Sequence, residues 1–408
     1  SLRGGYGEYF AVGNIVALVI NSQAVPPLAV KGTHVNTSGT PTQFTLPLTF
    51  TAADARGIQM ADYNVDTPTM HKWTLSVDQQ LPLHSALQIT YNGTRGYHLY
   101  QGLEGNPTVP VIVNNTPYWN GTQVRVNPNL GPTVNFTTSH AASKYNALVA
   151  QVATRLQSGL ESQVSYTWAH NFDNTATASG QGDCSAADGM AQPVYANDPN
   201  RYDYGPTCFD VANTFRFNLI YHLPNFRGAG FVSKFTNGWR IASLYSFNSG
   251  YPFRPSLSAL RAQNANLGGT KDIPNIATEA DARACPAVSA TCKFAPVPYN
   301  KRTVLLRKPS QWFNPNMFVM TPMYTSPGGA ACTTATCPTP NRSWGTIGNV
   351  KRGILRGPNL SNLDFSLAKD IALNLLGDQS RLEFRWEVFN VLNHANFGMP
   401  STATFAGG

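Results

Sequence analysis

Apolar and polar residues alternate strictly along several short stretches of this chain. In 381–389 large apolar residues alternate with charged ones: Leu382, Phe384, Trp386 and Val388 against Arg381, Glu383, Arg385 and Glu387. The segment 363–371 repeats the pattern: Leu363, Phe365, Leu367 and Ile371 against Asp364, Ser366 and Asp370. Because successive side chains of a β-strand point to opposite faces, both segments are predicted to be strands with one apolar and one polar face.

Five further stretches follow the same pattern and are also predicted strands: 73–77, 87–91, 160–168, 215–223 and 239–247. The longer runs approach the roughly 9 to 11 residues that a tilted strand needs to cross a bilayer. Aromatic residues stand at the ends of several runs: Trp73, Tyr91, Trp168 and Trp239. Membrane barrels carry such aromatic girdles at both lipid–water interfaces.

Short segments join the predicted strands in pairs, and long irregular segments separate the pairs. The predicted turns are 81–84, 157–159 and 375–378, each containing Pro or Gly. The predicted loops cover 20–70, 100–140, 171–209 and 250–345. Outer-membrane barrels show this asymmetry, with their long loops facing outward. We therefore expect an all-β fold, an antiparallel transmembrane β-barrel or part of one, with long external loops.

Other fold classes fit the pattern less well. A soluble β-sandwich alternates in the same way but usually has short loops, and no repeat of about 40 residues supports a propeller. The longest apolar run, 15–20, is far shorter than the roughly 20 residues of a membrane-spanning helix. Charged residues make up only 12% of the chain, and its 34 Gly and 29 Pro suit turn-rich loops better than helices.

Charged residues on two neighbouring predicted strands form the first candidate site. Asp364, Asp370, Glu383, Arg385 and Glu387 are predicted to form a charged wall facing the barrel lumen. Acid–base catalysis by the two glutamates is the alternative, but Arg385 lies between them on the same face and favours charge pairing. No hydrolase, metalloprotease, nucleotide-binding or haem motif occurs, and the eight histidines are dispersed. We expect no enzyme activity, no cofactor and no catalytic metal.

Acidic and aromatic residues in the predicted loops are further candidates for ligand binding. The loop 171–210 carries six aspartates: Asp173, Asp183, Asp188, Asp198, Asp203 and Asp210. They offer oxygen ligands for Ca²⁺, but their spacing fits no EF-hand, so a calcium site is disfavoured. Trp119 and Trp312 could stack on a sugar ligand, whereas packing in a core or girdle is the simpler interpretation.

The six cysteines all lie in loop-like segments: Cys184, Cys208, Cys285, Cys292, Cys332 and Cys337. Their even number favours disulfides in an oxidising compartment. Two pairs are close in sequence, which predicts the bridges Cys285–Cys292 and Cys332–Cys337 and leaves Cys184 with Cys208 by elimination. No spacing is Cys-x-x-Cys, so a zinc site is disfavoured.

The net charge of +8 comes from Lys and Arg spread along the whole chain. No nucleic-acid-binding motif accompanies the charge, so no nucleic-acid partner is expected. Phosphate-rich lipopolysaccharide and plain solvated loops explain the excess equally well.

The most specific signal lies near the C-terminal end. Residues 348–358 read Gly-Asn-Val-Lys-Arg-Gly-Ile-Leu-Arg-Gly-Pro and are followed by Asn362–Lys369 and Leu382–Gly398. This order resembles the C-terminal barrel signature of large TonB-dependent receptors that carry an N-terminal carboxypeptidase-regulatory-like domain, common in Acidobacteria. Further blocks resemble the same family in the same order: 3–7, 73–99, 145–168, 203–210, 237–239 and 249–253.

The resemblance implies an outer-membrane receptor for TonB-dependent uptake of an unidentified nutrient, which could be a small molecule, an oligosaccharide or a peptide. Outer-membrane lipid and the TonB system would be its partners. A structural or adhesive surface protein and a secreted β-rich hydrolase or lectin are the alternatives. Lys351, Gly353, Asn359 and Asn213 depart from the commoner residues of the family, in loops only.

No plug-like or TonB-contacting segment precedes Ser1, and no terminal strand ending in an aromatic residue closes the chain at Gly408. We therefore expect residues 1–408 to be the barrel region alone, a fragment that contacts the TonB system through a plug it does not contain.

Overall fold

A computed structural model describes the chain over 1–11, 32–33, 55–119, 124–128, 133–156, 158–175, 195, 197–226, 231–257, 272–289, 292, 294–324, 331–332, 344–372 and 380–404. Within these residues 56% lie in strands and 6% in helices. The predicted antiparallel all-β fold is confirmed. None of the described helices combines the length and apolar character needed to cross a membrane.

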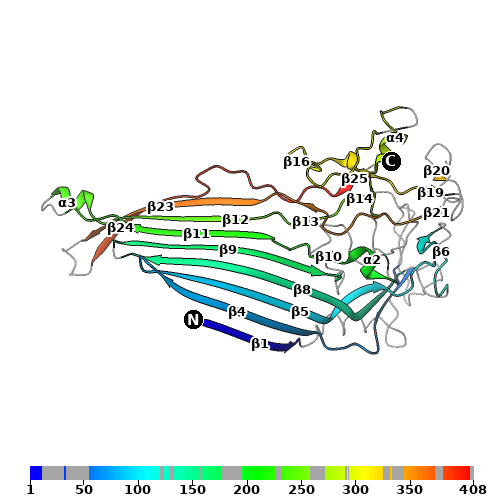
Figure 1. Cartoon of the computed structure of the whole chain (residues 1–408), viewed down its shortest axis with the longest axis horizontal. Coiled ribbons are helices and arrows are strands. Elements are labelled where there is room, and N and C mark those ends of the chain that lie inside the picture. The colour runs from blue at the N-terminus through cyan, green and yellow to red at the C-terminus, as the bar shows by residue number, and fades with distance from the viewer. Residues whose placement is uncertain are drawn as a thin grey trace, which may run out of the picture.

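Nine long strands form the main sheet, and each pairs antiparallel with the next along the chain. They are β1 (Leu2–Phe10), β4 (Thr69–Leu81), β5 (Ser85–Glu104), β8 (Thr133–Arg155), β9 (Leu160–Asp173), β11 (Asn213–His222), β12 (Trp239–Asn248), β23 (Leu360–Ala372) and β24 (Arg381–Val388). Figure 1 shows them running side by side along the long axis of the molecule. Every predicted strand belongs to this sheet.

Several strands are longer than predicted, and one pairing was not foreseen. Strand β5 continues to Glu104 and β8 begins at Thr133, so much of the predicted loop 100–140 is strand. These extensions do not alternate in polarity, since they lie beyond the apolar part of the sheet. Strand β3 (Ala55–Ala61) lies within the predicted loop 20–70 and pairs parallel with β8. Strand β2 (Gly32–Thr33) pairs with β3, and β10 (Gly205–Pro206) pairs with β9.

Two predicted turns are confirmed. Strands β4 and β5 are joined by Pro82 with Leu83 and His84, which both have positive φ, as a tight hairpin of twisted strands requires. The turn between β8 and β9 contains Gly159 with φ +89°, and a Cβ there would lie 2.9 Å from the His222 carbonyl oxygen. Only glycine fits both conditions. The third predicted turn, 375–378, lies outside the described residues.

The strand register places all the alternating apolar sets on one face of the sheet. One cross-strand row shows this, running over six strands: Leu87, Val152, Val164, Phe217, Tyr245 and Leu363. The adjacent row on the opposite face is polar: Asp78, Gln88, Gln151, Ser165, Arg216, Ser246 and Asn362. Side chains of the apolar face are exposed, with Leu75 at 50% and Trp386 at 61%. This distribution is that of a barrel wall in lipid.

Aromatic residues bound the apolar face at both ends. Trp168 pairs with Asn213 of β11. Eight residues further along β11, Tyr221 pairs with Ile241 of β12, and Trp239 lies two residues beyond that pair. These ten residues span about 33 Å along the strands at roughly 3.3 Å per residue. A tilt of about 40° reduces this distance to about 25 Å, the height of the apolar band in membrane barrels.

The long connections gather at one end of the sheet, and the short turns lie at the other with α3 (Phe231–Thr236) (Figure 1). They form a cap that contains short elements. The cap strands are β6 (Val111–Val113), β7 (Thr116–Tyr118), β13 (Pro252–Phe253), β14 (Ser256–Leu257), β15 (Asn275–Ile276), β16 (Leu305–Lys308), β17 (Gln311–Phe313), β18 (Phe318–Val319), β19 (Met323–Tyr324), β20 (Ala331–Cys332), β21 (Trp344–Gly345), β22 (Leu355–Arg356) and β25 (Ala403–Thr404). Its helices are α2 (Pro199–Asp203), α4 (Glu279–Ala284) and the 3₁₀ turn Pro315–Met317.

Both hydrophobic clusters of the described residues lie in this cap and not in the sheet. The larger cluster buries seven residues: Phe253, Val304, Phe313, Met317, Phe318, Val350 and Leu355. The smaller consists of Trp119, Ile273 and Ile347. The sheet has no core of its own because one face is apolar and exposed and the other is polar. The segment 250–345, predicted to be irregular, therefore supplies six of the ten buried residues of these two clusters.

The two faces of β9 respond differently to a charge. Val164 points to the apolar face and its neighbour Gln163 to the polar face, so Val164→Arg buries a cation in lipid. We expect Val164→Arg to destabilise the folded protein by about 2 to 4 kcal/mol and Gln163→Arg to change it little. Denaturant unfolding in lipid vesicles measures the difference. Equal effects of the two substitutions would contradict the assignment of the faces.

Candidate functional site

The five predicted wall residues share the polar face of β23 and β24, as their alternation indicated. Glu383 is the centre of the cluster, because two arginines hold its carboxylate. Arg385 donates to Oε1 of Glu383 at 2.5 Å, and Arg240 donates to Oε2 at 2.9 Å. Arg385 also lies 3.6 Å from Glu387. Arg240 belongs to β12 and was missed at the sequence level, because only the register shows that it faces this cluster.

A small residue makes this contact across three strands possible. Arg240, Ala368 and Arg385 occupy one cross-strand row of β12, β23 and β24. The Ala368 methyl group is nearly fully buried between the two arginines. A longer side chain at this position would separate the Arg240 guanidinium from Glu383. Both carboxylates considered for acid–base work therefore serve as partners of arginine.

The two aspartates of the predicted wall differ in their contacts. Asp364 accepts hydrogen bonds from the backbone N–H of Asn390 and from the side chain of Asn362, both at 2.8 Å. It therefore fixes the chain where it leaves β24. Asp370 lies directly opposite Glu383 in the register. Within the described residues its carboxylate has no hydrogen-bond or ion-pair partner.

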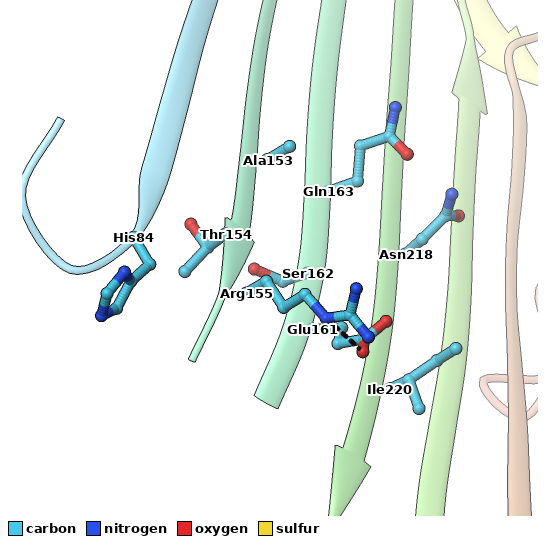
Figure 2. A pocket seen from close by; sticks show the side chains of 9 residues that line it. All are labelled: His84, Ala153, Thr154, Arg155, Glu161, Ser162, Gln163, Asn218 and Ile220. Carbon is cyan, nitrogen blue, oxygen red and sulfur yellow. Dashed lines mark ion pairs between the residues drawn. The ribbon is translucent and has the colours of Figure 1, made fainter. Parts of the chain in front are cut away.

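A hollow of about 500 Å³ lies on the same polar face, near the short turns (Figure 2). Its lining includes Gln163, Asn218 and Ile220, from β9 and β11, and His84 from the first turn. Arg155 and Glu161 point toward one another there and form an ion pair of 3.0 Å (Figure 2). The polar face thus carries paired charges along with amide side chains, which suits contact with water and polar solutes.

Three buried or half-buried arginine–aspartate pairs lie where the cap meets the end of β9; two tie the cap to the sheet or to the segment that follows β10, and Arg254 with Asp203 ties two segments of the cap to one another. Arg352 donates to Asp173, the last residue of β9, at 2.6 Å. Arg254 donates to Asp203 at 3.1 Å, and Arg356 donates to Asp210 at 2.5 Å. We call these three pairs the junction. Burial of a charge is tolerated when the charge is paired and hydrogen-bonded, as each of these is.

The junction explains why separate sequence blocks occur together. Strand β13 pairs with β22, which brings the block 249–253 against the block 348–358. A Cβ on Gly250 would lie 1.9 Å from the Gly357 carbonyl oxygen. Gly353 has φ +65° and packs under Pro206 of the block 203–210. Glycine is required at these positions by close approach and by the left-handed backbone.

The junction also shows how the described aspartates of the loop 171–210, considered above as calcium ligands, are used. Asp173, Asp203 and Asp210 carry their charges toward arginines and not toward one another. Asp198 accepts from the backbone N–H of Arg201 and caps α2. Asp183 and Asp188 lie outside the described residues. Within the described part of the chain no three potential metal ligands come together.

The structure gives both loop tryptophans packing contacts within the cap. Trp119 is 2% exposed and packs edge-on against Tyr195 at 5.7 Å. Trp312 is half-buried against the larger cluster, and its indole N–H donates to the Arg356 carbonyl oxygen at 2.8 Å. The expectation of ligand contact was therefore wrong for Trp119, and Trp312 has a structural contact. Core packing was the right interpretation, because large apolar rings supply most of the cap's buried surface.

One predicted disulfide is confirmed, between Cys285 and Cys292, and it rules out zinc at these two positions. Cys208 is also disulfide-bonded. Its predicted partner Cys184 lies outside the described residues, as does Cys337. The bridges Cys184–Cys208 and Cys332–Cys337 therefore remain predictions.

Removal of one junction charge should loosen the cap. Arg254 is fully buried, so Arg254→Met removes its ion pair with Asp203, at a cost of about 3 to 5 kcal/mol. We expect faster hydrogen exchange in 252–257, with partial recovery in the double variant Arg254→Met/Asp203→Asn. Arg385→Gln, at an exposed ion pair, is the control and should leave this segment protected. Unchanged exchange in Arg254→Met would contradict the role of the junction.

The cap should also loosen in strong alkali. Burial raises the pKa of the Tyr202 and Tyr299 hydroxyls above the ordinary value of 10.0. Because the neutral form is favoured in the folded state, this contribution is complete below pH 10 and is lost as the pH rises through the raised pKa. Protease sensitivity of the cap should increase above about pH 10. The variant Tyr202→Phe/Tyr299→Phe should move the onset to higher pH, and an unmoved onset would contradict this cause.

Comparison with known proteins gives a family and one fold likeness. No curated protein matches the chain. Among solved structures, the outer membrane transporter YddB from Escherichia coli aligns with a TM-score of 0.45 and 9% identity. The alignment covers 98% of this chain and 35% of that transporter, so the chain spans about a third of its length. A family model described as "Outer membrane beta barrel domain" matches residues 1–408. The chain therefore belongs to the outer membrane beta barrel domain family.

Proposed function

We propose that the chain is the barrel of an outer-membrane receptor that imports a scarce nutrient by TonB-dependent transport. The nutrient would be a small molecule, an oligosaccharide or a peptide. The outer membrane is the location of the family, and the two-faced sheet is the observation that carries the proposal. An anchor or adhesin needs only the apolar face, whereas an import path also needs a hydrated wall.

The polar face has the properties of such a wall. Its charges are paired on the surface, as in Arg155 with Glu161 and Arg240 with Glu383. Paired charges keep the surface hydrated without strong attraction for ions of one sign, so polar solutes can pass along it. In membrane barrels the residues facing the lumen adjust selectivity. The wall of Asp364, Asp370, Glu383, Arg385 and Glu387 is proposed to line the lumen.

The cap supplies a second element of the proposal. Binding residues of receptors are carried mainly by loops that a rigid scaffold positions. Here the loops have their own hydrophobic clusters and are tied to β9 through Asp173 and Arg352. A packed cap presents a defined surface, and this supports recognition of a specific ligand at the loop end. Two arginines bind the Glu383 carboxylate, which disfavours its use as the acid or base of a hydrolase on the polar face.

Uptake in living cells tests the proposal. Cells producing the complete receptor would be grown in mixed nutrients with the TonB system present or deleted, and depletion of each nutrient would be followed by mass spectrometry. We expect one compound to be depleted only when both receptor and TonB system are present. A cell without the receptor gene is the control.

Other outcomes would contradict the proposal. Binding of a compound or surface to the cells without import, regardless of the TonB system, would indicate an adhesive or structural protein. Release of a cleaved product into the medium would indicate a hydrolase.

A further inference from the structure

The apolar face ends differently at the loop end and at the turn end. At the turn end one cation, Lys369, belongs to the face, and the protein itself satisfies its charge. Its amino group donates to the Asn237 carbonyl oxygen and lies 5.4 Å from the Trp239 ring centroid. This is a lysine that reaches from an apolar surface to a polar group nearby.

At the loop end, in the part of the chain that the structure describes, the face carries two cations that form no ion pair. Arg95 of β5 and Lys144 of β8 are directly opposite one another in an unbroken stretch of register. Every second residue of β5 points to the same face, so Arg95 shares the apolar face with Tyr91. Lys144 is opposite Arg95 and belongs to that face as well. Within the described residues neither side chain has an ion-pair or hydrogen-bond partner. Directly opposed like charges destabilise a sheet, so this arrangement favours an anion between them.

The height of the pair on the sheet indicates where that anion lies. Trp73 belongs to the row just below, and its indole ring covers Gly93, where a Cβ would lie 2.1 Å from the ring. Arg95 follows two residues after Gly93, about 7 Å further along the strand. The pair therefore lies directly above the aromatic boundary of the apolar band. In a bilayer this is the level of the lipid headgroups.

Neighbouring groups leave the pair available. His71, in the same row, has its Nδ1 2.6 Å from the Tyr6 hydroxyl and its Nε2 3.8 Å from Glu8. Glu8 lies two strands away from Arg95, about 10 Å at the usual strand spacing, and is opposite His71. On the other side Phe172 pairs with Lys144 and contributes no charge.

We propose that Arg95 and Lys144 bind a phosphate group of a phosphorylated glycolipid in the outer leaflet of the outer membrane. The long loops of such barrels face the cell exterior, which places the pair in that leaflet. Arg offers a planar pair of donors to phosphate oxygens, and Lys adds a compact charge. The acyl chains of the same lipid would cover the apolar face below, around Trp73 and Leu148.

Lipid binding to the purified complete receptor in detergent tests the proposal, with native mass spectrometry as readout. The probes are bis-phosphorylated lipid A, its dephosphorylated form, phosphatidylglycerol and inorganic phosphate. We expect Arg95→Gln/Lys144→Gln to weaken binding of the bis-phosphorylated lipid about 30-fold, about five-fold for each charge removed. Lys72→Gln is the matched control and should bind like the unaltered protein. Lys72 is the neighbour of His71, which lies opposite Arg95 in the register, and it belongs to the opposite face of the sheet.

Two further arms keep the test decisive. Arg95→Lys/Lys144→Arg preserves both charges and should retain binding. If the neutral double variant does not fold, the unaltered protein must still bind the dephosphorylated lipid about 30-fold more weakly than the bis-phosphorylated one. Equal binding of both lipids, or unchanged binding by the folded neutral variant, would overturn the proposal. Inorganic phosphate binding as tightly as the lipid would show a free-anion site and would also overturn it.

Discussion

The structure depends on one requirement, that the backbone N–H and C=O groups of a wall in hydrocarbon find their hydrogen-bond partners in neighbouring strands. No water reaches these groups in hydrocarbon, so the strands must be long, adjacent and in unbroken register. Register then decides everything that the side chains do. A slip of one residue between β8 and β9 would move Val164 to the polar side and Gln163 into lipid. The apolar band, the polar wall and the two opposed cations above the band, Arg95 and Lys144, all follow from the same alignment.

A wall of this kind cannot stabilise itself with a buried core, since both of its faces meet other surroundings. The packed interior lies instead in the cap, where loops from distant parts of the chain surround Phe253 and Phe318. The junction connects the two parts. Its arginines and aspartates are shielded from water, so each charge depends on its partner, and loss of one leaves the other uncompensated. Ion pairs such as Arg352 with Asp173 in this way couple the cap to the sheet.

The three sets of charges in the molecule serve different purposes because their surroundings differ. Pairs on the polar face are exposed and contribute little to stability, but they keep that face hydrated. Pairs in the junction are buried or half-buried and hold the cap in place. Arg95 and Lys144 lie on the lipid side with no ion-pair or hydrogen-bond partner among the described residues, and their proposed partner is a lipid phosphate. Residue type alone does not distinguish these roles, whereas burial and neighbours do.

The sequence by itself determined the strands that alternate in polarity, their faces and two of the tight turns, but not β1, β3 or the short strands of the cap. These are local properties: a period of two in 381–389, or Pro82 and Gly159 between alternating runs, depends only on nearby residues. It also indicated the short-range bridge Cys285–Cys292. The five wall residues could be named because alternation alone places them on one face.

Only the tertiary structure decided which distant residues meet. Arg240 joins Glu383 across β23, and Asp173 meets Arg352 through a separation of 179 residues. Trp119, which an exposed loop would offer to a ligand, is buried because segments near 273 and 347 pack on it. Alternation ends where the strands leave the apolar band, so the sequences of the β5 and β8 extensions carry no alternating pattern from which these extensions could be predicted. Long-range packing has no signature in local sequence, because the partner of each side chain is chosen by the fold.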